Sequence, residues 1–449
     1  MVAMTACLQK FFPRPFFGYD CRTVEVEADI LNGMASLTIV GLGDAAVQES
    51  KERIRSAIKN SGLEYPRRKK TINLAPADLR KHGPAFDLPI AIGLLEESGQ
   101  IPKASGVKTA FIGELALGGE LRPVPGTLAL ASHLRSEGFQ KVMLPRENAA
   151  EAALVNEIAV FGFSHLSELV RCIRGEEKAE KTPPKKDVDE HPPDTLWRFE
   201  DIYGQEYAKR GLLIAAAGVH NVLLVGPPGS GKTLLARSFG SILPGLAFEE
   251  SLEVTKIHSI AGKLPPRMSR ITRPPLRSVH PTASVVSLIG GGGIPRPGEI
   301  SLAHRGVLFL DEFLEFPRGA LDCLRQPLED GVININRAAG SCIFPAEFIL
   351  LAATNPCPCG YFGDPIKRCR CRSHIMRQYR GKLSGPLLDR MDLMCSVPRI
   401  PLEKHRSGTG GISSKEFLQR VAKARVFQKT RWESSGKEYR SEKNEGKIR

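Results

Sequence analysis

Residues Gly226-Pro-Pro-Gly-Ser-Gly231-Lys232-Thr233 match the P-loop pattern G-x-x-x-x-G-K-[ST], and they directly follow the apolar run Val222–Val225. Glycines in such a turn let consecutive backbone N–H groups point inward at phosphates, and the helix that opens at Thr233 adds the positive end of its dipole. A glycine-rich turn that binds nothing is the alternative, but strand, loop and helix occur in the required order. The pattern therefore predicts that the chain binds a nucleoside triphosphate, ATP, through Gly226, Pro227, Pro228, Gly229, Ser230, Gly231, Lys232 and Thr233.

A second motif indicates hydrolysis. The apolar run Val307–Leu310 ends in Asp311 and Glu312. A buried parallel strand reads as a continuous hydrophobic run, and ligands bind at the carboxyl ends of such strands. We expect Lys232 to lie along the β- and γ-phosphates and Thr233 to hold Mg²⁺ together with Asp311. Glu312 would orient the attacking water. An acidic pair that only caps the next helix is the alternative, which the intact P-loop upstream makes the weaker one.

Length and composition bound the class of protein. At 449 residues the chain is expected to form two or three domains, and its apolar windows are too short to cross a membrane. The aromatic residues at 11–17 are interrupted by proline and arginine, so we expect no signal peptide. Ten cysteines without such a signal indicate reduced thiols and a cytoplasmic location.

The formal net charge of +14 is concentrated in two segments, 263–305 with almost no acid and 367–382 with none. Clustered cations without neutralising partners favour a polyanionic ligand, of which nucleic acid is the commonest. The alternatives are a solvated basic face, or arginines that reach a nucleotide across a subunit interface. The arginines and lysine that define these clusters are Arg267, Arg270, Arg273, Arg277, Arg296 and Arg305, followed by Lys367, Arg368, Arg370, Arg372, Arg377 and Arg380.

Alternating strand-like and helical stretches predict two α/β domains. In the first, at 1–175, strand-like runs at 24–26, 37–40 and 141–144 alternate with helical stretches at 45–60, 88–96 and 128–136. A charged, proline-bearing linker is expected at 176–195. The second domain, at 196–400, contains the P-loop, the acidic strand and a third apolar strand at 348–353, as in a doubly wound parallel sheet.

The stretch between the P-loop helix and the acidic strand is unusually long and includes a tetraglycine at 290–293. Long loops inside a compact domain are usually functional. Flexible glycine beside cations would suit a loop that grips a substrate strand, and a disordered insertion is the alternative.

Further motifs stand at 39–43 (IVGLG), 73–78 (NLAPAD), 298–304 (GEISLAH), 324–329 (LRQPLE), 355–360 (NPCPCG) and 384–390 (SGPLLDR). With these motifs the chain resembles the magnesium-chelatase-like AAA+ ATPases, in particular the YifB and competence protein ComM group, over about residues 16–432. The resemblance implies an AAA+ P-loop NTPase domain with a parallel sheet. It further implies that Asn355 is the sensor that helps to hold the hydrolytic water, and that residues 202–205 pack near adenine.

In the same family Arg390 matches the arginine finger, which would reach the nucleotide of a neighbouring subunit. Such a finger acts only in an oligomer, so the resemblance implies a homo-oligomeric ring, a hexamer. The resemblance to ComM also implies action on branched or single-stranded DNA, as a branch-migration helicase in recombination or natural transformation.

The first domain resembles the proteolytic domain of Lon, which implies an α/β fold. Lon-type proteases use a serine in G-P-S-A-G and a lysine further along the chain. Here the matching run is Gly83-Pro84-Ala85-Phe86-Asp87, and no lysine follows at the matching place. We therefore expect a catalytically dead binding or assembly module, with residues 67–70 and the pair Arg80 and Lys81 facing nucleic acid.

Two close cysteine pairs follow the sensor residue. Cys357, Cys359, Cys369 and Cys371 could enclose a tetrahedral Zn²⁺ and so fix the shape of the loop. Zinc ligands are usually paired with two residues between them, whereas here one residue separates each pair. Reduced cysteines on a structured loop are the alternative.

The end of the chain departs from the family pattern. Family members continue past the helix matched by residues 417–432 into a small helical lid with a sensor-2 arginine. Residues 433–449 are instead polar and lack apolar periodicity, so we expect them to be disordered. We interpret 401–449 as a truncated lid remnant with a basic tail, and expect hydrolysis to suffer more than nucleotide binding.

Taken together, the sequence predicts a Mg²⁺-dependent ATPase that forms a ring and moves along or remodels DNA. A metal-chelatase-type motor subunit, which inserts Mg²⁺ into a porphyrin with partner subunits, is the first alternative. The Lon-like first domain argues against it, because the chelatase motor resembles only the second half of this chain. A nucleotide-binding scaffold without turnover is the second alternative.

Overall fold

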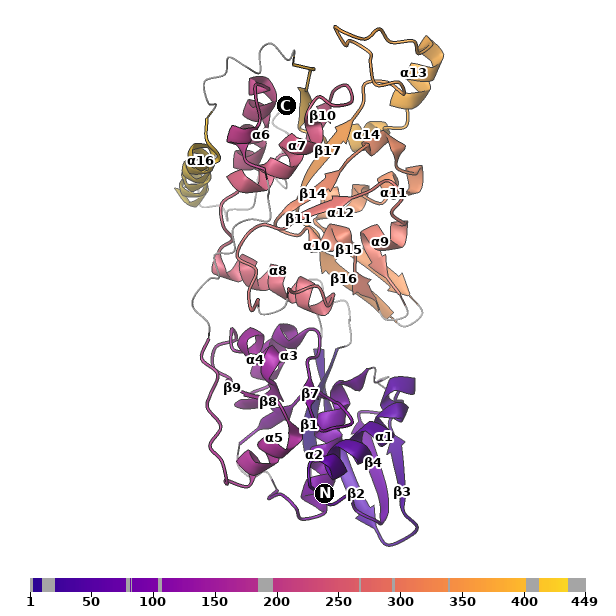
Figure 1. Cartoon of the computed structure of the whole chain (residues 1–449), viewed down its shortest axis with the longest axis vertical. Helices are drawn as coiled ribbons and strands as arrows, with labels where there is room; N and C mark the ends of the chain where they lie inside the picture. The colour runs from indigo at the N-terminus through magenta and orange to yellow at the C-terminus, as the bar shows by residue number, and fades with distance from the viewer. Residues whose placement is uncertain are drawn as a thin grey trace. The chain divides into compact units, whose positions relative to one another are not determined.

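The computed structural model describes residues 3–9, 21–77, 81, 83–103, 107–184, 197–265, 268–292, 295–337, 340–400 and 412–434. It divides into two compact units, Met1–Val188 with Thr255–Arg270 (unit 1) and Asp189–Val254 with Ile271–Arg449 (unit 2) (Figure 1). The aromatic run at 11–17, residues 185–195 of the expected linker and the tail after 434 lie outside the described residues. Within the described ranges, every helix is too short or too polar to span a bilayer.

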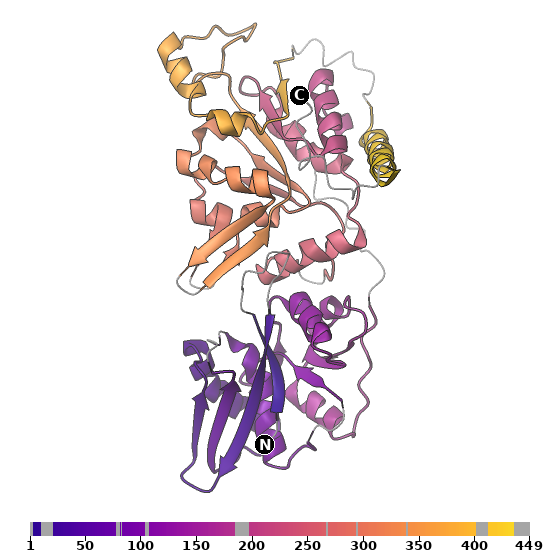
Figure 2. The same cartoon turned by 180° about the vertical axis from the view of Figure 1, so that it is seen from behind.

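Unit 1 is built on a seven-stranded mixed sheet of order β3-β4-β2-β1-β5-β8-β9. Strand β2 runs antiparallel to both of its neighbours, β1 and β4, and the other neighbouring pairs are parallel. Figure 2 shows the long strands β1 and β2 side by side. The elements are β1 Ala3–Gln9, β2 Cys21–Leu31, β3 Ser36–Val40, α1 Ala45–Asn60, β4 Lys69–Ala75, the 3₁₀ turn η1 Pro84–Phe86, α2 Asp87–Glu97, β5 Thr109–Phe111, β6 Glu114–Leu115, β7 Leu121–Arg122, α3 Thr127–Ser136, β8 Lys141–Pro145, α4 Arg146–Ala152, β9 Ala159–Phe163 and α5 Leu166–Ile173.

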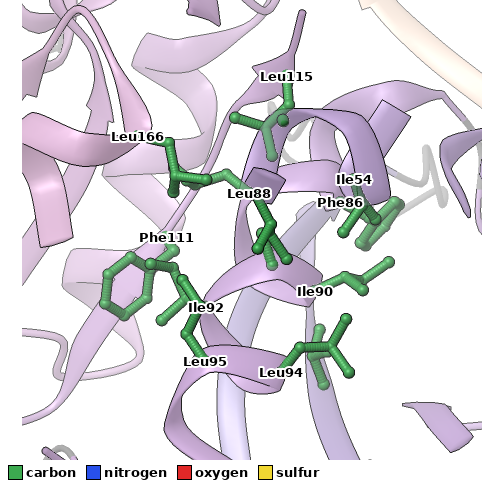
Figure 3. Close-up of a cluster of buried hydrophobic side chains, with 14 of the residues drawn as sticks. Ile54, Phe86, Leu88, Ile90, Ile92, Leu94, Leu95, Phe111, Leu115 and Leu166 are labelled. Atoms are coloured by element: carbon green, nitrogen blue, oxygen red, sulfur yellow. The ribbon is translucent and has the colours of Figure 1, made fainter. Parts of the chain in front are cut away.

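Helix α2 forms the centre of the unit 1 core. Its residues from Asp87 to Glu96 are all buried, as expected for a helix that is hydrophobic on every side. Leu88, Ile92 and Leu95 lie near Phe111 and Leu166, while Ile90 and Leu94 point the other way (Figure 3). The strands and helices predicted for this domain are confirmed, because each predicted stretch falls within β2, β3, β8, α1, α2 or α3.

Unit 2 is built on a five-stranded sheet of order β11-β14-β17-β10-β18, in which every neighbouring pair is parallel. Its elements are the 3₁₀ turn η2 Phe199–Asp201, α6 Glu206–Gly218, β10 Val222–Val225, α7 Lys232–Ser238, η3 Phe239–Ile242, α8 Phe248–Ile260, β11 Leu276–Val279, α9 Val285–Ile289, β12 Gly290–Gly291, β13 Arg296–Pro297, α10 Glu299–Leu302, β14 Val307–Leu310, η4 Phe313–Glu315, α11 Arg318–Asp322, α12 Arg325–Asp330, β15 Val332–Arg337, β16 Gly340–Pro345, β17 Ile349–Thr354, α13 Ser373–Arg380, α14 Gly385–Leu388, β18 Leu393–Ser396 and α16 Ser414–Ser434. The division between the units passes through α8.

The central strands of unit 2 have the burial that their apolar sequences predict. Every residue of β14 and β17 is buried, so both faces of the sheet are covered in this region. The long stretch before β14 is largely structured, which its glycine and proline content did not predict. Leu276–Val279 pairs with β14 as a strand of the main sheet, and Gly290 and Gly291 pair with Arg296 and Pro297.

Helix α16 belongs to the unit 2 core. Phe417 and Val421 are buried, and the ring centroids of Phe417 and Phe199 lie 5.2 Å apart. Arg425 donates to the carbonyl of Ala216, the residue near the end of α6. The helix expected at 417–432 is therefore present, and it is packed against the sheet domain through its apolar residues.

Candidate active site

The P-loop follows β10 and needs glycine at several positions. Gly229 and Gly231 have φ angles of 75° and 94°, in the left-handed region that glycine adopts without strain. A β-carbon on Gly226 would lie 2.1 Å from the carbonyl oxygen of Val397, so a side chain does not fit there. The sequence thus permits a tight turn that brings backbone groups close to a ligand.

Lys232 lies over the loop that precedes it. Its ammonium donates to the carbonyls of Gly226 at 2.7 Å and Pro227 at 2.9 Å, and to Oδ1 of Asn355 at 3.2 Å. Burial lowers the pKa of Lys232, and the nearby carboxylates of Asp311 and Glu312 oppose this effect. The lysine and the expected sensor residue are therefore in direct contact.

Thr233 and Asp311 also meet. The Thr233 hydroxyl donates to Oδ2 of Asp311 at 2.7 Å, and the backbone N–H of Glu312 donates to Oδ1 of the same carboxylate at 2.9 Å. Glu312 has a φ of 50°, and its own side chain is exposed. A hydroxyl and a carboxylate at this separation offer the oxygen ligands that Mg²⁺ takes beside substrate phosphates.

Strand order explains why these residues converge. Strand β17, which leads into Asn355, lies between β10, which leads into the P-loop, and β14, which leads into Asp311. Because the three strands are parallel, their carboxyl ends share one edge of the sheet. Residues far apart in sequence are thereby placed around one loop.

Gln205 connects the segment before α6 to the P-loop. It adopts a left-handed conformation with φ of 58°, and its buried amide donates to the carbonyls of Ser230 at 3.1 Å and Pro398 at 2.7 Å. These bonds fix residues 202–205 against the phosphate loop and against the chain that leaves β18.

The backbone of Arg390 lies at the amino end of β10, opposite the end that leads into the P-loop. Its carbonyl accepts a hydrogen bond from Asn221, the residue before β10, at 2.8 Å, whereas the P-loop follows the last residue of β10. The guanidinium forms an ion pair with Glu329, and 38% of the Arg390 side chain is exposed. Arg390 is therefore on the surface and does not lie with Lys232 and Asp311.

Sequence reasoning missed Arg399. Its guanidinium donates to the carbonyl of Pro228 at 3.2 Å, and it lies 3.8 Å from the carboxylate of Asp364. A cation shortly after an apolar strand of a parallel sheet is the signal that could have identified it, because the carboxyl ends of such strands carry ligand-binding residues.

The cysteines of the two pairs come together. One side-chain sulfur each from Cys357, Cys359, Cys369 and Cys371 lies within 4.8 Å of all the others. The distances between the sulfurs of Cys357, Cys359 and Cys369 are 3.4 Å and 3.6 Å.

The two cationic clusters differ once the tertiary contacts are known. In the first, Arg277 pairs with Glu299 at 2.7 Å, and Arg305 pairs with Glu253 and Glu347. Arg267 lies outside the described residues. In the second cluster the side chains of Arg368, Arg370, Arg372 and Arg377 are exposed, and no described carboxylate pairs with them.

The expectation that Lys70 and Lys81 of unit 1 face nucleic acid is wrong, because both are fully buried. Lys70 donates to the carbonyls of Pro66 and Arg68 at 2.8 Å, and Lys81 donates to the carbonyl of Pro76. Residues 67–69 are exposed, and Arg80 lies outside the described residues.

Unit 1 contains an ion pair with a buried carboxylate directly after the 3₁₀ turn Pro84–Phe86. Asp87 is fully buried and accepts from Nε of Arg53 at 2.8 Å. Burial raises the pKa of Asp87 to about 6, although Arg53 opposes this rise. Asp87 is the first residue of helix α2.

Comparison with known proteins follows the same division of the chain. The sequence profile of the family described as "Magnesium chelatase, subunit ChlI" matches residues 198–405, and the profile described as "Subunit ChlI of Mg-chelatase" matches residues 26–148. The magnesium-chelatase 67 kDa subunit of Chlorobaculum tepidum is 30% identical over 162 residues, which are 35% of this chain and 23% of that protein.

Two relatives match nearly the whole chain. YifB of Escherichia coli is 43% identical over 418 residues, covering 92% of this chain and 81% of the relative. The competence protein ComM of Haemophilus influenzae is 41% identical over 426 residues, covering 94% and 82%. The chain therefore belongs to the YifB and ComM family of magnesium-chelatase-like proteins.

Proposed function

We propose that this protein is a Mg²⁺-dependent ATPase of the AAA+ class that assembles into a hexameric ring and remodels DNA. The observation that carries the proposal is the contact of Thr233 with Asp311, beside the contact of Lys232 with Asn355, at one edge of a parallel sheet. A P-loop lysine and a metal-holding acid are the parts that phosphoryl transfer requires.

Each residue has a distinct role in this mechanism. Lys232 binds the β- and γ-phosphates, while backbone N–H groups of the glycine-rich loop point at the same oxygens. Thr233 and Asp311 would hold Mg²⁺, which when bound offsets charge on the phosphates. Glu312 orients the attacking water and Asn355 helps to hold it. Gln205 keeps the adenine-side segment against the loop.

Arg390 would act on the nucleotide of a neighbouring subunit. Its backbone lies at the amino end of β10 and its own P-loop at the carboxyl end, and a strand of this length spans about 13 Å. The exposed guanidinium, held by Glu329, is available at a surface of unit 2. This arrangement supports catalysis across a subunit interface.

DNA is the proposed substrate because of the segment around α13. Four exposed arginines there have no described carboxylate partner, and the exposed ring of Phe362 lies 4.9 Å from the guanidinium of Arg380. Unpaired cations beside exposed aromatic rings are typical of surfaces that bind single-stranded nucleic acid. The similarity to ComM, a competence protein, supports the same class of ligand.

We also propose that unit 1 is a Lon-like module without protease activity. Ala85 occupies the position of the nucleophile in its motif and carries no hydroxyl group. A role in assembly or binding would use the exposed residues 67–69.

The proposal is tested by measuring ATP turnover with and without branched or single-stranded DNA. We expect DNA to stimulate turnover by the wild-type protein. Glu312→Gln should abolish turnover and leave ATP binding intact, whereas Glu315→Gln, a nearby exposed carboxylate paired with Lys382, should retain turnover. The four-arginine variant Arg368→Gln, Arg370→Gln, Arg372→Gln and Arg377→Gln should keep basal turnover and lose stimulation.

The alternatives predict other results. A metal-chelatase motor subunit would not respond to DNA and would respond to partner proteins; its support is the match of the chelatase subunit to a third of the chain. A scaffold would bind ATP without turnover under any of these conditions. Either result would overturn the proposed DNA-remodelling ATPase.

A further inference from the structure

Four cysteine side chains gather on the loop between β17 and α13. Their sulfur atoms all lie within 4.8 Å of one another, and three of them are 3.4 Å to 3.6 Å apart. All four are free thiols, and Cys357 is buried. Figure 1 shows this loop and α13 at the outer part of unit 2, beyond the end of β17.

The spacing fits a single metal ion. A Zn–S bond of about 2.3 Å places the sulfurs of a tetrahedron about 3.8 Å apart, close to the distances observed here. An iron–sulfur cluster has several iron atoms between its cysteine ligands, so those sulfurs lie farther apart than around one ion. Four thiolates are also the donor set that zinc prefers in structural sites.

Backbone N–H groups donate to two of the four sulfurs. The backbone N–H groups of Tyr361 and Arg370 donate to the sulfur of Cys359, and that of Cys371 donates to Cys369 at 3.4 Å. Hydrogen bonds of this kind orient metal ligands.

The same loop contacts the phosphate loop. Gly360 has a φ of 83°, and a β-carbon on it would lie 2.5 Å from Cδ of Pro228 and 3.8 Å from Cγ of Asn355. The residue after Cys359 is therefore packed against the P-loop and the sensor residue. A change in the shape of the cysteine loop would therefore alter the packing around both Pro228 and Asn355.

We propose that Cys357, Cys359, Cys369 and Cys371 bind one structural Zn²⁺ ion, and that this ion holds Gly360 against the P-loop. Zinc binding itself is independent of ATP hydrolysis. The effect on the P-loop relies only on the nucleotide-binding part of the proposed function.

The first test is the metal content of the full-length protein, expressed with added zinc and purified without chelators. Elemental analysis should find about one zinc per chain in the wild type and in the control Cys323→Ser, a thiol of the same unit outside the cluster. Cys369→Ser combined with Cys371→Ser should lower the content to below about a tenth. Wild-type protein that holds no zinc after dialysis against Zn²⁺, or that holds iron instead, would overturn the proposal.

The second test uses wild-type protein only, so it does not depend on a variant that folds. Zinc is removed with a zinc-selective chelator, Mg²⁺ is restored, and the affinity for a fluorescent ATP analogue is measured. We expect affinity to fall about tenfold and to return when Zn²⁺ is added back. Unchanged affinity after complete zinc loss would overturn the coupling to the P-loop and leave the zinc site standing.

Discussion

Lys232 in unit 2 and Lys70 in unit 1 are both buried lysines whose ammonium groups donate to nearby main-chain carbonyls. Around Lys232, the ends of two further strands contribute Asn355 and Asp311. The adjacent P-loop contains glycines with positive φ angles. Around Lys70 the partners are the carbonyls of its own segment and the ring of Tyr65, 4.5 Å away. The difference teaches that a buried cation identifies a site only where side chains from separate elements converge on it.

The largest expected effect concerns the two lysines. Lys232→Ala removes the cation that binds the phosphates, so we expect ATP binding and turnover to fall below detection. Lys70→Met keeps the length of the side chain and should leave nucleotide affinity unchanged. Both are measured by equilibrium binding of a fluorescent ATP analogue. Equal losses in the two variants would remove the distinction between the lysines.

A variant of Arg390 tests whether residues of two subunits contribute to one active site. Arg390→Ala should lower turnover by about a thousandfold while ATP binding is retained. Mixing Arg390→Ala subunits with Glu312→Gln subunits should restore activity, because some interfaces then combine Glu312 of one subunit with Arg390 of its neighbour. If mixed oligomers form and remain inactive, Arg390 does not act in trans.

Asp87 is a buried charged residue of unit 1 that, like Lys70, lies outside the candidate active site. Asp87→Asn keeps an oxygen acceptor for Arg53 but removes the titratable carboxylate, so we expect the unfolding free energy to depend less on pH than in the wild type, with no change in ATP affinity. The pKa of Asp87 is about 6 in the folded protein, above its ordinary value of 3.8. The folded state therefore binds the proton of Asp87 more tightly than the unfolded state does. The contribution of this proton to the free energy of unfolding is complete below pH 4 and is lost as pH rises through 6.

Chemical denaturation of both proteins across this range measures the effect. The stability of the wild type relative to Asp87→Asn should decrease from pH 4 to pH 7. A difference that increases over this range would mean that the carboxylate form is the one favoured by folding.

The smallest effect is expected at Gln205. Gln205→Leu removes two hydrogen bonds, to Ser230 and Pro398, so ATP affinity should fall by about fivefold. Titration with the same ATP analogue measures it. An unchanged affinity would place Gln205 with Lys70 among the residues that serve only the fold.

The convergence of Lys232, Thr233, Asp311 and Asn355 was predictable from sequence because these residues occupy short motifs with fixed spacing. The P-loop, Asp311 and Asn355 each follow an apolar strand, and parallel strands bring their carboxyl ends together. In unit 1, hydrophobic periodicity predicted the stretches that fall within β2, β3, β8, α1, α2 and α3.

Individual side-chain contacts outside the short motifs were not predictable. The pairing of Arg277 with Glu299, and the approach of Arg399 to Pro228, depend on how loops fold back on the sheet. The burial of Lys70 and Lys81 also went against their hydrophilic character, since carbonyl oxygens of neighbouring turns satisfy their ammonium groups. A count of charges therefore overestimated the exposed cationic surface.

The distance between Arg390 and its own P-loop has a consequence for regulation. If Arg390 completes only the site of a neighbouring subunit, an isolated chain does not hydrolyse ATP at any ATP concentration. Turnover per chain would then rise steeply with protein concentration and vanish on dilution. The concentration of the protein would itself determine how much ATP each chain hydrolyses.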